Sequence, residues 1–360
     1  MDSRGCAAAA PITKNRDSAH IPSLDGIRAI AALLVFIAHA GLEDRVPGGF
    51  GVTIFFFLSG YLITTLLRTE HATHGRINLK NFYLRRAYRI WPPMYIALAV
   101  AAMPTYAFAP SITAGAALAQ AFHLTNYYII FFGYAHIIPA TGPMWSLAVE
   151  EHFYLLYPIA LTFLLRKMTN RRASLVLAGI CALVLLWRCL LVYLIRYGHE
   201  YTYLASDARF DSLLYGCILA LSLNPALDEQ SLVSERRWSQ ILIVAVALLL
   251  STFVYRNPNF RETFRYSIQG VALLPIFYCA VRYNRWKLFA WLELPLVRGF
   301  GIITYTFYLI HLKALDVAGM IARNMLVRGC LGFVIALAFS LTMYFLVERH
   351  LAALRRRLHN

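Results

Sequence analysis

Long apolar runs separated by short polar and basic stretches fill the chain between residues 24 and 348. The runs lie at 24–41, 50–67, 90–108, 112–132, 148–165, 174–195, 211–223, 240–255, 266–281, 302–322 and 329–347. An apolar stretch of about 18 or more residues with few charges is long enough to cross a bilayer as a helix. The pattern therefore predicts an all-α integral membrane protein.

The basic residues predict how these runs are threaded. Most lysines and arginines lie in the N-terminal tail and in the segments 68–89, 166–172, 236–237, 282–298 and 349–357. Cytoplasmic segments are enriched in lysine and arginine, so we assign these stretches to the cytoplasm. If all the runs crossed, the basic turn after residue 165 would face outward. We therefore predict about ten transmembrane helices, both termini in the cytoplasm, and a re-entrant or interfacial segment at 112–132, which also contains Gln120, His123 and Asn126.

This threading divides the chain into a cytoplasmic N-terminal tail (1–23), a membrane domain (24–348) and a basic cytoplasmic C-terminal tail (349–360). The tail at 1–23 lacks an apolar core followed by a cleavage site, so we expect no cleaved signal peptide. The membrane region fills the chain nearly end to end, and we expect no appended soluble domain.

Composition excludes several other classes. Hydrophobic residues make up 59% and charged residues 14% of the chain, against about 25% charged in an ordinary soluble domain. The net charge of +16 does not indicate nucleic-acid binding, because the basic residues punctuate the apolar runs and do not gather on one solvated domain. The six cysteines show neither CxxC pairs nor a metal-like spacing, so we expect no disulfide framework and no metal site.

Two ionisable residues interrupt the first apolar run. Arg28 and His39 are almost three helical turns apart, so their side chains project from nearly the same face, about 16 Å apart along the axis. Arginine keeps its proton, and a charge within hydrocarbon is costly, so we expect both residues to face protein or a water-filled cavity. Ionisable residues inside a membrane helix indicate a functional site.

A basic cluster, NFYLRRAYRIWPPMY, opens the third predicted span. Arg86 and Arg89 are three residues apart, and Arg85 and Arg89 are four apart, so the cluster stacks on one helix surface. Guanidinium groups bind phosphate bidentately, which suits a nucleotide-like donor. The same arginines could instead be cytoplasmic charges that set the orientation of the span and bind lipid phosphate. Spacing alone favours that interpretation.

The stretch TGPMWSLAVEEHFYLLYP carries two adjacent carboxylates, Glu150 and Glu151, just after Trp145 and Ser146. Adjacent helical residues are about 100° apart, so both glutamates cannot face one cavity. Either could act as a general base or orient a histidine. Alternatively, Ser146 caps this helix and a glutamate near the N-terminus complements the helix dipole. The neighbouring aromatic residues and histidine favour a functional role.

Three weaker signals complete the candidates. The stretch GGFGVTIFFFLSGYLIT ends in Ser59 and Tyr61, although its small residues also suit close helix packing. Arg209 and Asp211 lie at the predicted outer end of another run and form a candidate ion pair. His311 lies inside the run that contains YTFYLIHLK, where a packing role and a functional role are equally expected.

Together these motifs resemble the acyltransferase-3 family of bacterial membrane acyltransferases, often described through its O-acetyltransferases. The resemblance extends from about residue 23 to residue 348, in the family's order. It rests on an Arg-x10-His spacing met by Arg28 and His39, and on an Arg-x-x-Arg motif met by Arg86 and Arg89. The stretches FFFLSGYLI, WSLAVEEHFYLLYP and FYLIH are also similar to family signatures. One position departs, because Thr53 stands where many members have an aspartate.

The resemblance implies a multi-pass enzyme of the bacterial inner membrane that moves an acyl group, often acetyl, from a cytoplasmic thioester to a hydroxyl. Family acceptors are mostly sugars of surface polymers or glycolipids, and some are secondary metabolites. Acyl-CoA, most simply acetyl-CoA, would be the co-substrate, and no cofactor would be bound permanently. Arg86 and Arg89 would hold its phosphates, with Arg28 at the same end.

His39 is then the candidate catalytic base or transient acyl carrier, because a neutral imidazole can do either near neutral pH. Glu150, with Glu151 in reserve, would orient or polarise it.

Two other function classes remain as alternatives. A transporter of a lipid-linked sugar or metabolite would also carry intramembrane charges, but the chain shows no internal repeat of the transporter kind. A glycosyltransferase with a polyprenyl-linked donor is less favoured, because the predicted outer loops carry few acidic residues.

Overall fold

The computed structural model describes residues 21–108, 112–196, 198–228, 233–356 and 358, and within these ranges every regular element is a helix. The elements are α1 (Pro22–Ile37), η1 (Ala38–Leu42), α2 (Gly48–His74), α3 (Leu79–Phe108), α4 (Ala114–Ala121), α5 (Thr125–Phe132), α6 (Met144–Lys167), α7 (Asn170–Cys189), η2 (Leu190–Ile195), α8 (His199–Leu204), α9 (Ser206–Ser222), α10 (Glu235–Val254), α11 (Pro258–Glu262), α12 (Phe264–Arg282), α13 (Lys287–Ala290), η3 (Trp291–Glu293), α14 (Pro295–Ile321), α15 (Met325–Met343), η4 (Tyr344–Glu348) and α16 (Arg349–Arg356). The prediction of an all-α fold is confirmed.

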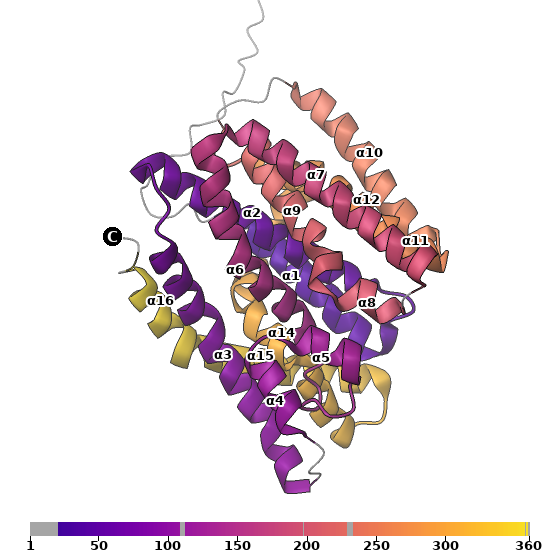
Figure 1. The fold of residues 1–360 in the computed structure, drawn as a ribbon. Coiled ribbons are helices and arrows are strands. Elements are labelled where there is room, and N and C mark those ends of the chain that lie inside the picture. The colour runs from indigo at the N-terminus through magenta and orange to yellow at the C-terminus, as the bar shows by residue number, and fades with distance from the viewer. Residues whose placement is uncertain (1–20, 109–111, 197, 229–232, 357, 359–360) are drawn as a thin grey trace, which may run out of the picture.

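Seven helices within the described ranges are long and apolar enough to cross a membrane. The number rises to eight when α13–η3 and α14, which meet at a 63° bend, are counted as one broken span. Two further helices, α3 and α9, belong to the same bundle but are not among these candidates (Figure 1). The protein is thus a multi-pass membrane protein. The count of ten crossings and the cytoplasmic termini stay predictions, and the N-terminal tail lies outside the described residues up to residue 20.

The segment predicted not to cross is folded as two short helices, α4 and α5. Each has eight residues, or about 12 Å of helix, which is less than half of the hydrocarbon thickness. They meet at His123, whose φ of 58° turns the backbone sharply. The amide of Gln120 donates to Thr141, and the amide of Asn126 donates to Ser206 at 3.0 Å. These polar side chains therefore bond to protein, as suits a segment that lines the bundle interior.

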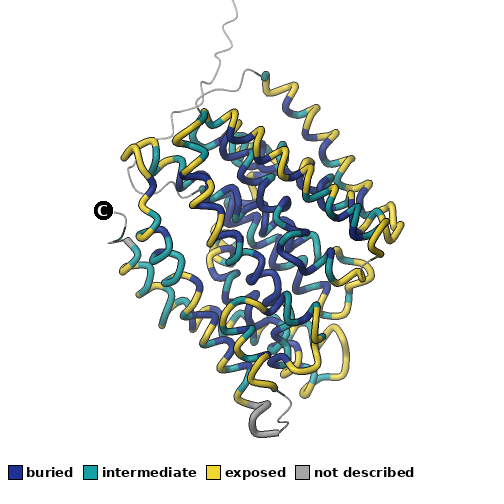
Figure 2. Tube along the Cα trace, in the orientation of Figure 1, coloured by how far each residue is buried: buried dark blue, intermediate teal, exposed yellow. Residues whose placement is uncertain are grey.

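The centre of the bundle is formed by α1, α2 and α9, which are rich in buried residues, whereas α7 and α10 lie outside (Figure 2). α2 and α9 cross in backbone contact. A Cβ atom on Gly60 would lie 1.9 Å from the carbonyl oxygen of Leu213, and one on Gly216 would lie 1.9 Å from that of Phe57. Only glycine allows this approach, which brings the polar faces of α2 and α9 together.

A buried ion pair joins α7 to α9. The guanidinium of Arg188 donates to both carboxylate oxygens of Asp211, at 2.9 and 2.6 Å, and both side chains are fully buried. The hydroxyl of Ser267 on α12 donates to the same carboxylate at 3.0 Å. The predicted pair of Arg209 with Asp211 is therefore wrong. Residues two apart on a helix project about 200° apart, so Arg209 faces α2 and not the partner of its neighbour.

Candidate active site

A cavity of about 110 Å³ lies between α1, α2, α3, α6 and α14. Arg28, Arg86 and Arg89 line it together, from α1 and α3. Ser146 and Tyr308 line its other end, near the start of α2. The lining residues of α2 run from 52 to 62, which is about 15 Å of helix. The arginine pattern and the glutamate motif, widely separated in the sequence, thus converge on one elongated site.

The arginine end of the cavity holds an excess of positive charge. Arg28 donates to the buried Asp25 at 2.6 Å. The guanidinium of Arg86 lies 4.4 Å from the ring centre of Tyr154, a cation–π contact. Arg89 is exposed at the mouth, within electrostatic range of Arg28 and Arg86. Three guanidinium groups in this space favour an anionic ligand over a neutral one.

Arg85, predicted to join this cluster, lies elsewhere. Its guanidinium donates to Glu70 at 3.1 Å and to the carbonyl oxygen of Leu358 at 3.0 Å. It does not line the cavity. Arg85 precedes Arg86 by one residue and so points about 100° away from it, toward the end of α2 and the C-terminal segment. The structure therefore limits the cluster to Arg28, Arg86 and Arg89.

Glu150 lines the middle of the cavity. One of its carboxylate oxygens accepts from Ser59 at 2.8 Å, and the other accepts from Tyr154 at 3.1 Å. As the 100° spacing predicts, the adjacent Glu151 does not line the cavity, and one of its oxygens is buried without a hydrogen-bond partner in the described part of the chain. Glu150 is thus the carboxylate that faces the arginines.

A hydrogen bond joins two residues that line the end of the cavity opposite the arginines. The hydroxyls of Ser146 and Tyr308 lie 2.7 Å apart, and both also approach the carbonyl oxygen of Pro143. Ser146 therefore bonds across to α14, and its interpretation as a simple helix cap is not supported, since the N-cap position falls on Pro143.

Beyond Tyr308, two histidines form a bonded pair. Nδ1 of His39 lies 2.9 Å from Nε2 of His311, and the rings are stacked at 24° with centroids 5.1 Å apart. Nδ1 of His311 lies 2.6 Å from the backbone carbonyl oxygen of Tyr308. His311 is buried, whereas His39 is exposed.

These contacts determine where the protons lie in the neutral pair. A carbonyl oxygen only accepts, so Nδ1 of His311 carries a proton and its Nε2 is the acceptor. Nδ1 of His39 must then donate to that nitrogen. The remaining nitrogen, Nε2 of His39, is left with a free lone pair. This is the protonation state that a general base or a nucleophile requires.

The expected partnership between Glu150 and His39 is not found. The hydrogen-bond partners of Glu150 are Ser59 and Tyr154, and that of His39 is His311. The single helical stripe from Arg28 to His39 is also interrupted, because α1 ends at Ile37 and continues as a π-helical turn. A π turn holds more residues than an α turn and changes the direction of the following side chains. Arg28 lines the cavity, whereas His39, which lies in the π turn, contacts His311 of α14.

Arg209 is fully buried and bonds to no carboxylate in the described structure. Its guanidinium lies 4.0 Å from the ring centre of Tyr266 and within 6 Å of the Phe56, Trp145 and Tyr203 rings. It donates to Thr53 at 3.3 Å. The faces of the aromatic rings thus stabilise the positive charge of Arg209. Thr53 supplies a neutral hydroxyl at this position and not a carboxylate.

The remaining candidates, Tyr61, Trp145 and Asp211, contact other residues of the protein interior. Tyr61 is buried and donates to the side chain of Asn224 at 2.8 Å, away from the cavity. Trp145 packs edge-on to Phe56 and against Tyr203, in the wall beside Arg209. Asp211 belongs to the ion pair of the bundle interior. These three residues support the site without lining the cavity.

The sequence did not single out Tyr308, which contacts both the cavity end and His311. The signal was present, because Tyr308 lies three residues before His311 and therefore on the same helical face. In the described ranges, no group of three or more histidine, cysteine, aspartate or glutamate residues could hold a metal ion.

Comparisons with known proteins identify the family to which the chain is similar. The family model described as an acyltransferase domain matches residues 21–345. The O-acetyltransferase OatA of Staphylococcus aureus is 30% identical over 304 residues, covering 81% of this chain and 50% of that protein. The peptidoglycan O-acetyltransferase OatA of Listeria monocytogenes is 32% identical over 244 residues, covering 65% of this chain and 39% of that protein.

The chain spans about half the length of the curated relatives it matches, or less. No solved structure matches it significantly. The matched region includes every residue of the arginine cluster, Glu150 and both histidines. By this match over most of its length, the chain belongs to the acyltransferase-3 family of membrane acyltransferases.

Proposed function

We propose that this protein is an O-acyltransferase that moves an acetyl group from acetyl-CoA to a hydroxyl group of a cell-envelope sugar polymer. The observation that carries the proposal is the elongated cavity with three arginines at one end and a histidine pair just beyond the other. The names of the relatives supply the acceptor class, because both are O-acetyltransferases and one is named for peptidoglycan.

The arginine cluster suits the donor. Coenzyme A carries phosphate groups on its nucleotide and a thioester at the end of a long, thin arm. Arg86, Arg89 and Arg28 would bind the phosphates through bidentate hydrogen bonds. The arm would follow the cavity for about 15 Å along α2 toward Tyr308. The basic residues around α3 favour a cytoplasmic position for this mouth.

Glu150 suits a supporting role at the cluster. Held by Ser59 and Tyr154, it places a carboxylate opposite the arginines and keeps them from repelling one another before the donor binds. It also lies next to the path of the arm, since it lines the same cavity.

The transfer step follows from the free lone pair of His39. Nε2 of His39 would take the proton of the acceptor hydroxyl as the hydroxyl oxygen attacks the thioester carbonyl carbon. The carbon–sulfur bond then breaks, and the leaving thiolate recovers the proton from His39. The same nitrogen could instead attack the carbonyl first and carry the acetyl group before the acceptor arrives. In both routes His311 acts only through His39, as a positioning residue.

The direct test uses the purified full chain with radiolabelled acetyl-CoA and peptidoglycan fragments or other surface glycans as acceptors. We expect label to move to a glycan hydroxyl with the unaltered protein, and His39→Ala to abolish transfer without weakening acetyl-CoA binding. Full transfer by a folded His39→Ala variant would overturn the role of His39. Failure of the unaltered protein to bind acetyl-CoA would overturn the donor.

A further inference from the structure

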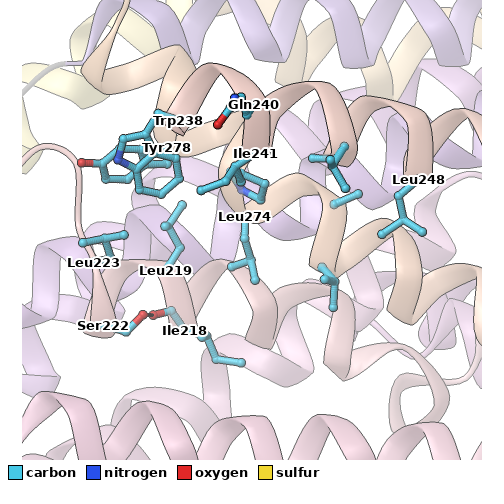
Figure 3. Close-up of a pocket in the computed structure, with 15 residues that line it drawn as sticks. Ile218, Leu219, Ser222, Leu223, Trp238, Gln240, Ile241, Leu248, Leu274 and Tyr278 are labelled. Carbon is cyan, nitrogen blue, oxygen red and sulfur yellow. Dashed lines mark hydrogen bonds between the residues drawn. The ribbon is translucent and has the colours of Figure 1, made fainter. Parts of the chain in front are cut away.

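A second and larger cavity lies on the opposite side of the bundle from α3. It has a volume of about 580 Å³ and is a groove between α9, α10 and α12 (Figure 3). Its walls are aliphatic and aromatic side chains, and Ser222 and Gln240 are the polar residues on its rim. The hydroxyl of Ser222 is already bonded to the carbonyl oxygen of Ile218. Water in such a groove would lack the polar partners that it needs.

The groove opens on the membrane-facing surface. α10 is among the least buried of the candidate spans. Only 22% of the residues in its most apolar stretch are buried inside the protein. Val244, Leu248 and Val271 line the groove and are themselves exposed. A groove of this kind within a bilayer is in contact with lipid acyl chains, so an apolar chain and not a soluble ligand is the fitting occupant.

The two ends of the groove differ in the side chains that line them. Trp238 and Tyr278 stack at one end with ring centroids 4.0 Å apart, and Gln240 and Ser222 lie near them (Figure 3). Both rings are buried, but the adjoining first turn of α10 carries the exposed Arg236 and Arg237, which places this end near the level of the lipid head groups. The groove then runs to Leu248, ten residues further along α10, or about 15 Å. That depth equals the hydrocarbon thickness of one leaflet, which is about 15 Å.

Basic residues surround the aromatic end. Arg236 and Arg237 are exposed in the first turn of α10. Arg285 is exposed next to Trp286, whose indole donates to Glu235 at 2.7 Å and so holds the turn after α12 against the start of α10. Among these described residues Glu235 supplies one negative charge, against three positive charges from Arg236, Arg237 and Arg285. The net charge of this described group at the mouth is therefore positive.

From the length of the groove, its aromatic end and its charge, we propose that it binds an anionic phospholipid of the surrounding leaflet. One acyl chain would lie along α10 between Trp238 and Leu248, and the phosphate would bind Arg236 and Arg237. This site is separate from the acyl-transfer cavity, which has different walls. Its occupant would be a bound component of the membrane and not a substrate.

The test reconstitutes the full chain in vesicles of phosphatidylcholine that contain a photoactivatable phosphatidylglycerol, with the reactive group in the acyl chain. After illumination, cross-linked residues are mapped by mass spectrometry. We expect cross-links at the residues that line the groove, and far fewer on the outward face of the same helix, for example at Ile243, which is 68% exposed. An even spread of cross-links around α10 would overturn the proposal without any variant being needed.

Two pairs of variants sharpen the test. Ala245→Phe fills the groove and should reduce cross-linking there, whereas Ile243→Phe on the same helix should not. Arg236→Gln with Arg237→Gln should lower the preference for phosphatidylglycerol over phosphatidylcholine about fivefold or more, because each basic residue contributes near an anionic membrane. Arg171→Gln with Arg172→Gln, at the basic start of α7, is the matched control and should leave that preference unchanged.

Mass spectrometry of lipids that remain bound after purification supplies an independent readout. A co-purifying anionic phospholipid that is lost in Ala245→Phe supports the proposal. A polyprenyl phosphate in its place, or equal retention of zwitterionic and anionic phospholipids, overturns it.

Discussion

Tyr308 contributes to the site twice, through its hydroxyl and through its backbone. The hydroxyl bonds to Ser146 at the end of the cavity, and the carbonyl oxygen orients His311. His311 in turn fixes the ring of His39. One residue of α14 thereby links the arginine-lined cavity to the nitrogen proposed to react. Movement of Tyr308 would both open the cavity and change the histidine geometry.

This chain of contacts predicts a difference between two substitutions of His311. Asparagine can still accept a hydrogen bond from Nδ1 of His39, whereas leucine leaves that donor unpaired. General-base catalysis contributes about 10²–10⁴-fold, so we expect His311→Leu to lose on the order of a hundredfold in kcat. His311→Asn should keep a larger share of kcat, and both variants should keep the KM for acetyl-CoA.

The measurement is steady-state transfer across a range of pH. If the two variants lose activity equally, or if KM for the donor changes with kcat, then His311 does not act by positioning His39.

The arginine cluster gives a second prediction at this scale. Arg89→Gln removes a charge-assisted contact to phosphate, each of which contributes about 1.5–3 kcal/mol, so the Kd for acetyl-CoA should rise at least about tenfold. Arg85→Gln is the matched control, because Arg85 bonds to Glu70 outside the cavity. Isothermal titration with the purified protein measures both. Similar weakening by the two substitutions would mean that general charge, and not the cavity, holds the donor.

At the scale of the helices, the crossing of α2 and α9 determines whether the cavity can form. A methyl group on Gly216 would meet the backbone carbonyl of Phe57 at 1.9 Å, and backbone cannot move aside cheaply. We expect Gly216→Ala to cost about 1–3 kcal/mol of stability, as overpacking does, and to lower the Tm of the detergent-solubilised protein. Gly179→Ala on the outer helix α7 meets nothing within 4 Å and should leave the Tm nearly unchanged.

Helix identities were predictable from the apolar pattern, but several helix ends were not. α6 begins at Met144, four residues before its predicted apolar run, because its first turn packs against α14 and needs no lipid-facing surface. α1 changes to a π turn at Ala38. This turn has only five residues, which are too few to distinguish the period of a π-helix from that of an α-helix in a sequence. The glycine at position 41, which adopts a φ of 113° in the structure, was a local sequence sign of that change.

A contact between two short helices outside the spans gives a prediction about pH. His199 on α8 lies 2.8 Å from Glu262 on α11, and Thr202 donates to the same carboxylate at 2.6 Å. The hydrogen bond with Glu262 raises the pKa of His199 above its usual value. Burial raises the pKa of Glu262, but the bonds from His199 and Thr202 outweigh it and lower the pKa overall.

The stabilising effect of His199 is therefore complete below its usual pKa of 6.5 and is lost as the pH rises through the higher value in the folded protein. That of Glu262 is complete above 4.5 and is lost as the pH falls through its lowered value. The pair should therefore contribute most to the stability of the folded protein between pH 4.5 and pH 6.5. Because His199 is 63% exposed, the effect is small, on the order of a few tenths of a kcal/mol. Melting curves from pH 5 to 9 should show a smaller fall in Tm for His199→Gln than for the unaltered protein.

At the scale of the whole molecule, the pairing of distant side chains could not be predicted. His39 and His311 are 272 residues apart, and Arg188 and Asp211 meet across α7 and α9. Membrane helices have similar apolar surfaces, so hydrophobic pattern does not specify which of them are neighbours. The order of motifs did indicate the family and the charged cluster. It did not reveal that Glu150 and His39 have separate partners, because that depends on the rotation of each helix in the bundle.

The threading of the chain is the remaining prediction at this scale, and it decides from which side the arginine cavity is entered. Single cysteines at exposed loop positions, in a variant that lacks the natural cysteines, can be labelled with a membrane-impermeant thiol reagent. With both termini in the cytoplasm, Glu43→Cys and Arg256→Cys should be labelled in intact cells. Arg76→Cys and Arg171→Cys should be labelled only after the membrane is permeabilised. Arg76 precedes α3 and Arg86 on the same side of the membrane, so labelling of Arg76→Cys from outside would place the arginine mouth away from the cytoplasm, where acetyl-CoA could not reach it.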